Sequence, residues 1–367
     1  MIDTIVLNSP DLEEDIALKI EEISVQRMGV DFQINELLYR FTTKELKGTY
    51  DSSIRINIKR EKLISEFDLR TRKNIATKRQ CNPYMQVECS LHKIKIGHNI
   101  FGGSDDIKGQ VLYLISLLEN ELQVDLPNYN DWFISRIDYA KVYNLGNSLS
   151  DFFKGFSNVY YPRRSAIKYS DSGLYFPGTY TTLKLYDKGL EFKKHDKKKL
   201  RKILTPYQIM WLELLSHGIL RIEVEVKTRK LKDLYNEKLP KVNEIKIEDL
   251  INQYNVEIGR IFKIGEDKMK IYNTTKDVEN VLYSHYGSEG NILFGTWFRL
   301  TITGYDTVKK SMAKTTFYRH INKLKKAGIS WNYTDVTLEK NKVIEFIFNP
   351  LNSDLEVNDD YIFRKVS

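Results

Sequence analysis

The chain contains a stretch in which every second side chain is aliphatic: Arg221-Ile222-Glu223-Val224-Glu225-Val226-Lys227. Successive side chains of a β-strand point to opposite faces of its sheet, so the three aliphatic residues share one face. Arg221, Glu223 and Glu225 then share the other face. The pattern predicts a strand that packs on a core with one face and carries charged groups on the other.

Three further stretches alternate in the same way, and each leaves polar side chains on the face opposite its aliphatic residues. These side chains are Lys184, Tyr186 and Lys188 from Thr182–Lys188, Arg136 and Asp138 from Phe133–Tyr139, and Glu88, Ser90 and His92 from Met85–His92. If the four strands belong to one sheet with a common core face, their charged groups converge on the other face. The sequence therefore predicts a charged site on a sheet.

Carboxylates on this face suit a hard divalent cation, because Mg²⁺ and Mn²⁺ prefer oxygen ligands. The candidate metal ligands are Glu88, Asp138, Glu223 and His92. The His92 imidazole has an alternative role as an ordinary surface or hydrogen-bonded side chain. We expect two arginines to orient the carboxylates by charge-assisted pairing, namely Arg136 and Arg221.

Tyr186 is the candidate nucleophile of the site. The ammonium groups of Lys184 and Lys188 would stabilise its phenolate and attract a phosphate, so all three are candidate catalytic residues. A tyrosine, cationic groups and a metal ion together are suited to phosphoryl transfer. The alternative is a common strand tyrosine beside solvated lysines.

Several short segments also occur in a characteristic order along the chain. They are Met1–Leu7, Gly97–Gly102, Ser135–Asp138, Tyr186-Asp187-Lys188, Leu220–Glu223 and Gly304–Asp306. This collinear set resembles the gene II/X replication proteins of filamentous phages and covers most of the chain. The resemblance implies a rolling-circle replication initiator related to the HUH endonucleases, with Tyr186 as the DNA-nicking nucleophile. One feature departs from that class: no His-x-His pair occurs among the six histidines.

The activity implied by the resemblance is that of a site-specific nicking and closing endonuclease. It would cut one strand of origin DNA through a 5′-phosphotyrosyl intermediate and require Mg²⁺ or Mn²⁺. Its partners would be single- and double-stranded origin DNA and a host helicase and DNA polymerase. Two alternatives are a non-catalytic origin-binding protein or repressor, and a conjugative relaxase. Relaxases usually carry an N-terminal nucleophile and a histidine triad, and neither feature is found here.

The composition is compatible with a DNA-binding protein. The chain has 367 residues and a formal net charge of +8, which suits a polyanionic partner. Its two cysteines provide neither a disulfide framework nor a zinc set, which favours a reducing cytoplasm. No signal peptide or apolar run of transmembrane length is found, so we expect a cytoplasmic protein without a membrane partner.

Two basic segments flank the Tyr186 strand. Tyr160–Arg164 mixes aromatic rings with Arg163 and Arg164, as surfaces that bind single strands do. Lys193–Lys202 follows Tyr186 and includes the candidate DNA ligands Lys193 and Lys194. Such runs are also common on solvated surfaces without a ligand.

The predicted fold is α+β, with a central antiparallel sheet and packed helices over residues 1–240, as in HUH-type nickase cores. Helices are expected over residues 107–126, from the Thr205-Pro206 start to the Gly218 stop, and over residues 246–262 and 275–286. Residues 241–367 are expected to form a smaller, mostly helical domain.

Within that domain, residues 307–329 resemble the two helices of a helix-turn-helix. A strand over Val343–Ile347 would complete a winged variant. The side chains expected to face DNA are Lys314, Thr315, Tyr318, Arg319 and Lys323. The alternative is a helix pair that packs against the first domain.

Overall fold

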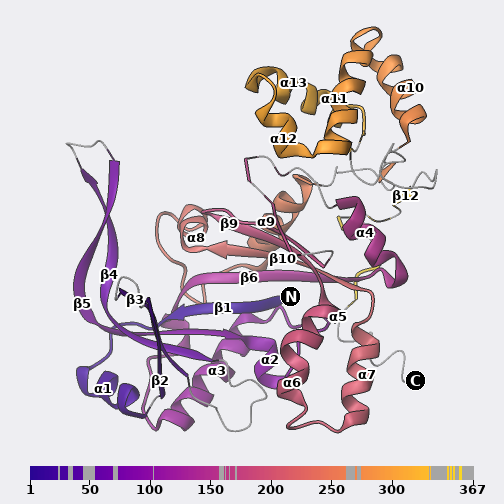
Figure 1. Cartoon of the computed structure of the whole chain (residues 1–367). Helices are drawn as coiled ribbons and strands as arrows, with labels where there is room; N and C mark the ends of the chain where they lie inside the picture. Colours follow the sequence, from indigo (N-terminus) through magenta and orange to yellow (C-terminus); the bar gives the residue numbers. More distant parts are fainter. Residues whose placement is uncertain are drawn as a thin grey trace.

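The chain folds into a large body made of a sheet and packed helices and a smaller helical unit (Figure 1). The computed structural model describes residues 1–23, 25–31, 36–43, 54–68, 73–101, 103–156, 161, 163–164, 166–169, 172–261, 269–270, 274–329, 331, 345–346, 348, 350–351 and 355–357. Among the helices in these ranges, none has the length and apolar character needed to cross a bilayer.

The α+β class with an antiparallel sheet is confirmed. The main sheet has ten strands in the order β2-β3-β4-β5-β1-β6-β10-β9-β8-β7, and every pair of neighbours is antiparallel. Their bounds are β1 (Ile2–Asn8), β2 (Val25–Asp31), β3 (Glu36–Thr43), β4 (Arg55–Asp68), β5 (Lys73–Ser90), β6 (Phe133–Asn144), β7 (Ile167–Lys168), β8 (Gly173–Phe176), β9 (Thr181–Asp187) and β10 (Ile219–Lys227). The four strands predicted from their alternation thus lie in one sheet.

The aliphatic face of this sheet carries the main core. Its buried strand residues include Val87 on β5, Ile137 on β6 and Val224 on β10. Helices that place apolar residues in the same cluster include α1 (Glu14–Ile23), α3 (Ile107–Leu122), α4 (Leu149–Phe156) and α9 (Ile247–Gly259). Burial of these side chains supplies the hydrophobic free energy that holds the sheet in place.

The opposite face is covered only in part. A second apolar cluster joins Val142 and Ile219 of the sheet to Phe192, Leu200 and Ile209. These last residues belong to a helical hairpin made of α5 (Lys188–Glu191), a π-helical turn η3 (Phe192–Asp196), α6 (Lys197–Leu200) and α7 (Pro206–Ser216). The hairpin covers one end of β6 and β10, and the charged part of this face lies beyond it.

Helix α7 begins as predicted. Thr205 and Gln208 form a reciprocal capping box, Pro206 occupies the first turn, and Gly218 follows with a φ of 74°. Helix α3 ends at Leu122, before the expected position 126, because Gln123 adopts a left-handed conformation.

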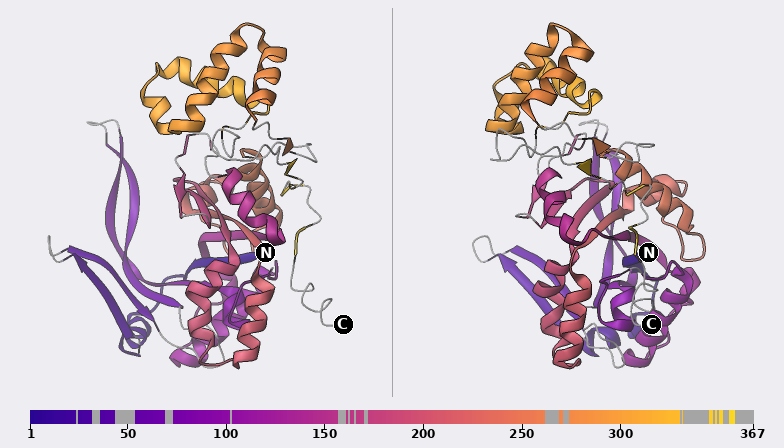
Figure 2. Two further views of the ribbon diagram at one scale, coloured as in Figure 1. Left: turned by 45° about the vertical axis from the view of Figure 1, so that its right-hand side comes forward. Right: turned by 90° about the vertical axis from the view of Figure 1, so that its right-hand side faces the viewer.

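A long hairpin of β4 and β5 extends away from the rest of the sheet, as Figures 1 and 2 show. It pairs continuously from Arg55–Glu88 to Asp68–Lys73, with one register shift between Lys59 and Glu61. We call this hairpin the β4–β5 arm.

The helical unit has a core of its own. It consists of α10 (Thr275–Tyr286), α11 (Glu289–Thr303), α12 (Tyr305–Lys310) and α13 (Lys314–Lys326). Residues 242–258 pack instead in the core of the sheet, so the first domain extends beyond the expected boundary at residue 240. Helices α12 and α13 match the predicted helix pair. Of the predicted wing strand, the structure describes β12 (Glu345–Phe346), which pairs with β11 (Met269–Lys270); residues 332–344 lie outside the described part.

Candidate functional site

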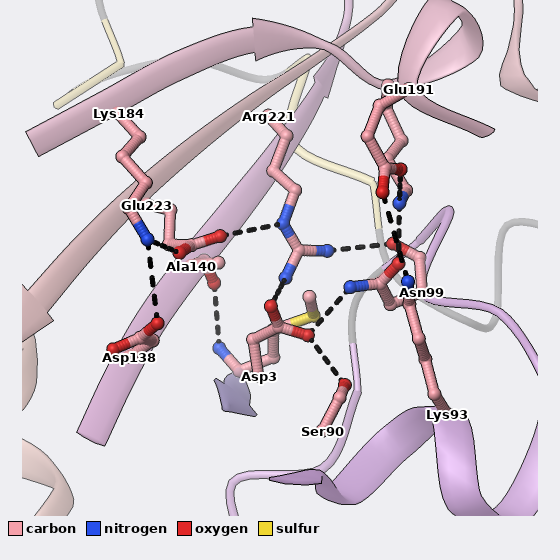
Figure 3. Close-up of polar contacts among 12 residues, drawn as sticks. Asp3, Ser90, Lys93, Asn99, Asp138, Ala140, Lys184, Glu191, Arg221 and Glu223 are labelled. Carbon is pink, nitrogen blue, oxygen red and sulfur yellow. Dashed lines mark hydrogen bonds and ion pairs between the residues drawn. The ribbon is translucent and has the colours of Figure 1, made fainter. Parts of the chain in front are cut away.

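Three neighbouring strands, β6, β10 and β9, bring several of the predicted polar side chains together on one face of the sheet (Figure 3). Glu223 on β10 is central. Its Oε1 accepts a hydrogen bond from Lys184 Nζ at 2.8 Å, and its Oε2 accepts one from the Tyr186 hydroxyl at 3.1 Å. Lys184 Nζ also lies 3.1 Å from Glu225 and 3.7 Å from Asp138. The alternating pattern therefore placed these side chains on the correct face.

Asp138 sits at the edge of this cluster and is buried. Arg136 contacts its carboxylate with Nε and Nη2 at 2.9 and 2.6 Å, as predicted for an orienting arginine. Burial and the Glu223 carboxylate raise the pKa of Asp138 to about 8, although Lys184 and Arg136 oppose that rise. The face is thus a dense set of compensating charges.

A second set of contacts surrounds Arg221, which is fully buried. Its Nη2 lies 3.0 Å from Asp3, its Nε lies 3.6 Å from Glu223, and its Nη1 donates to the Asn99 carbonyl at 2.7 Å. Asp3 also accepts hydrogen bonds from Asn99 and Ser90 (Figure 3). Arg221 therefore orients Glu223, which in turn contacts the candidate nucleophile.

Asp3 and Asn99 were not predicted as site residues. Strict alternation would have put Asp3 on the same face as the core residues Ile5 and Leu7, but the strand has a register shift between Ile2 and Ile5. Asn99 lies in a connection after α2 (Leu91–Ile96), where no periodic pattern applies. Burial alone would raise the pKa of Asp3; Arg221, Lys93 and Asn99 outweigh it and hold that pKa well below its usual range.

The environment of Tyr186 differs from the prediction. Burial raises the pKa of its hydroxyl well above the ordinary value of 10.0, and the Glu223 and Asp3 carboxylates add to this rise, while Arg221 opposes it. Lys184 shares the face with Tyr186, but its ammonium group is held by carboxylates. The expected stabilisation of the phenolate by two lysines is therefore wrong.

Lys188 does not lie on the strand. Strand β9 ends at Asp187, whose side chain accepts a hydrogen bond from the Leu190 N–H and so caps α5. Lys188 is fully buried in the first turn of α5, where its Nζ contacts Glu191 and donates to Asn99 at 2.5 Å. It supports the Asn99 connection and does not reach the Tyr186 hydroxyl through any described contact.

The four candidate metal ligands are not assembled into one site. Glu88 pairs with Arg55 and Arg136 at the far side of the cluster. His92 lies in α2, because β5 ends at Ser90, and it is buried. Within the described residues, no three His, Cys, Asp or Glu side chains are arranged to hold a metal ion. The predicted ligand set is therefore not supported by the geometry.

The candidate DNA ligands divide into exposed and internally paired side chains. Arg164 is a structural residue: it bonds to Thr181 and Phe176 and lies 3.3 Å from Glu257. Lys323 is held by Glu289 at 2.5 Å. The exposed members are Arg163, Lys193, Lys194, Lys314, Thr315 and Arg319, and Tyr318 is half-buried. Tyr160 lies outside the described residues.

Two buried histidines next to this face predict a contribution to acid unfolding. Burial lowers the pKa of His92 to about 4 and that of His98 to about 3. The folded state therefore keeps both rings neutral, while the unfolded chain binds protons below about pH 6.5. Each histidine should contribute stability above that pH, and about 2 kcal/mol of it should be lost at about pH 5.

Urea unfolding of wild type and His98→Phe at about pH 7.5 and pH 5 isolates this contribution. Comparison with the variant is needed because the pKa of Asp138 is raised in the folded state, so Asp138 makes the protein more stable as the pH falls, opposite to the histidines. His98→Phe should lose about 2 kcal/mol less than wild type between the two pH values. The exposed His217→Gln serves as control, and equal losses for His98→Phe and wild type would contradict the prediction.

The fold and the site define an α+β protein with a tyrosine–carboxylate cluster on the open face of an antiparallel sheet. Residues 1–257 match the family of the N-terminal part of the phage replication-associated protein (the gene II protein), and the chain belongs to that family. It is 28% identical over 287 residues to the replication-associated protein of Salmonella phage IKe, covering 68% of each chain. It is 25% identical over 284 residues to that of Enterobacteria phage M13, covering 67% of this chain and 69% of the other.

Proposed function

We propose that this protein nicks and rejoins one strand of origin DNA with Tyr186 as the nucleophile, and so initiates rolling-circle replication. The observation that carries the proposal is the hydrogen bond from the Tyr186 hydroxyl to Glu223, 3.1 Å long, on the open charged face of the sheet. Membership of a family of phage replication-associated proteins supports DNA as the substrate.

The raised pKa of Tyr186 means that its hydroxyl needs a base. Glu223 is the carboxylate placed to take the proton as the Tyr186 oxygen attacks the phosphorus. The bond between phosphorus and the 3′ oxygen then breaks, which leaves a 5′-phosphotyrosyl link. The 3′ oxygen gains a proton from water and becomes a free hydroxyl that a host polymerase can extend, with a host helicase to open the duplex.

Rejoining is the reverse of this reaction. A 3′ hydroxyl gives its proton back to the solvent as its oxygen attacks the phosphotyrosyl phosphorus. The bond between phosphorus and the Tyr186 oxygen breaks, and Tyr186 recovers its proton from Glu223. Arg221 fixes the Glu223 carboxylate through its ion pair, and Lys184 supplies positive charge beside it. The resemblance also implies a divalent cation, but the described carboxylates are already held by cations, so no step is assigned to a metal here.

The experiment is to trap the covalent intermediate. Purified protein should be incubated with single-stranded origin DNA in Mg²⁺ and in Mn²⁺, denatured, digested with trypsin and analysed by mass spectrometry. We expect a nucleotide on the peptide that contains Tyr186. A nicked product without any protein-linked DNA would overturn the proposal, and origin binding without nicking would favour the repressor alternative.

We further propose that α12 and α13 contact duplex origin DNA. In Lys314→Ala plus Arg319→Ala, two exposed cations are lost, so the slope of log K against log salt should fall by about two units for duplex origin. Nicking of a single-stranded oligonucleotide should continue. Lys323→Ala is the matched control, since its ammonium is paired with Glu289. Unchanged duplex binding at every salt concentration in the double variant would rule out this role.

A further inference from the structure

A large groove runs beside the β4–β5 arm and has a volume of about 1390 Å³. One wall is the arm, including Lys59, Lys62 and Lys78. The other wall is formed by the ends of β1 and β6 and by residues 228–244, which include α8 (Thr228–Leu234). The arm rises beside the body of the protein in Figures 1 and 2.

The groove lies on the same face of the sheet as Tyr186. On β5, Tyr84 and Gln86 line the groove, and two residues further on Glu88 contacts Arg136 of the charged cluster. Residues two apart on a strand share a face. Lys59 is the cross-strand partner of Tyr84. Five strand spacings separate β9 from β4, or roughly 24 Å, so one bound polymer can span both the cluster and the groove.

The cations of the groove fall into two groups. Four of them are neutralised locally: Arg60 by Glu14 and Glu21, Lys62 by Asp11, Lys78 by Glu61, and Lys241 by Asp131. Three others, Lys59, Lys232 and Lys238, form no ion pair within the described part of the chain.

Lys59 is the most informative of the three. It is half-buried, and burial alone lowers the pKa of its ammonium group. A partly desolvated ammonium without a carboxylate partner is unfavourable in the free protein. Its position in the same groove as two further unpaired lysines indicates a site that an external anion completes.

We propose that this groove binds the DNA strand next to the scissile phosphate, with Lys59, Lys232 and Lys238 contacting successive phosphates. The inference rests on the proposed nicking function, which makes DNA the polyanion that passes over Tyr186. The binding of DNA in the groove can nevertheless be measured independently of any reaction at Tyr186.

The test uses full-length Tyr186→Phe protein, which cannot cut, and a fluorescent oligodeoxythymidylate of about 30 nucleotides. Adding Lys59→Gln, Lys232→Gln and Lys238→Gln should weaken binding by roughly tenfold near 0.1 M salt, and the salt slope should fall by about two units at about 0.7 per contact. Fluorescence anisotropy at several salt concentrations measures both quantities.

The matched control removes the same charge from the same groove. Lys62→Gln, Lys78→Gln and Lys241→Gln delete paired lysines, so the salt slope should fall by less than about one unit. Circular dichroism and thermal melting establish that both triple variants fold. Equal affinities of the unpaired-lysine variant and its parent, or equal losses in the two triple variants, would overturn the groove assignment. Nicking by Tyr186→Phe would overturn the proposed function instead, and the binding result would remain interpretable.

Discussion

Replacing Tyr186 with phenylalanine should reduce nicking by about 10⁴-fold or more, because the variant lacks the attacking oxygen. The substitution keeps the ring, which lies edge-on to Tyr175 at a centroid distance of 6.5 Å. It removes one hydrogen bond, to Glu223, so stability should change by about 1 kcal/mol. DNA affinity should stay within about twofold, because phosphate contacts by cations carry most of it.

The control for this prediction is Tyr175→Phe, since Tyr175 is the neighbouring tyrosine on β8. We expect it to nick supercoiled origin plasmid at the wild-type rate. Gel electrophoresis measures the amount of nicked plasmid, and mass spectrometry identifies the residue that carries the covalently attached DNA. Retained nicking by Tyr186→Phe, or DNA attached to Tyr175 or the exposed Tyr180, would refute the assignment.

The polar face of the sheet could be predicted because strand alternation is a local property. Glu223, Lys184 and Tyr186 meet as expected, since β9 and β10 are neighbours in register, with Glu223 opposite Lys184 and Arg221 opposite Tyr186. The prediction that β9 and β10 lie side by side rested on the assumption that the strands share one sheet, which only the tertiary structure could establish. The periodicity of the sequence predicts single strands, but it does not predict which strands are neighbours in the sheet.

The site predictions that are wrong lie where a strand ends and a helix begins. Alternation predicts that His92 shares a face with Ser90, and that Lys188 shares a face with Tyr186. In both cases the chain had already turned into a helix, α2 or α5. Asp187 carried a usable signal, because aspartate is a favoured N-cap residue and predicts a helix start.

Electrostatics was the least predictable property. Sequence spacing put lysines near Tyr186, but it could not show that surrounding carboxylates neutralise them or that burial dominates the pKa of the hydroxyl. In the groove, too, the sequence does not show which lysines are paired, because the partners can be as far apart in the chain as Asp11 and Lys62.

The largest expected loss of stability is for Arg221→Met. The side chain is fully buried between Asp3 and Glu223. Its removal would leave the buried Asp3 carboxylate without its ion-pair partner, while Glu223 would keep its ion pair with Lys184. Breaking such a buried network by deleting one partner costs about 3–5 kcal/mol. Nicking should also fall in the folded fraction, because Glu223 loses the group that orients it towards Tyr186.

Two companion variants separate charge from packing. Lys62→Met breaks an exposed pair with Asp11 and should cost less than about 1 kcal/mol. Adding Asp3→Asn to Arg221→Met removes the stranded carboxylate charge, so it should recover part of the lost free energy of unfolding, measured by urea denaturation. If Arg221→Met unfolds at the wild-type urea concentration, the network does not stabilise the sheet. Removal of the buried charge on Asp3 should make the double variant more stable than Arg221→Met. If the double variant is less stable instead, the stability lost in Arg221→Met comes from lost packing around the guanidinium.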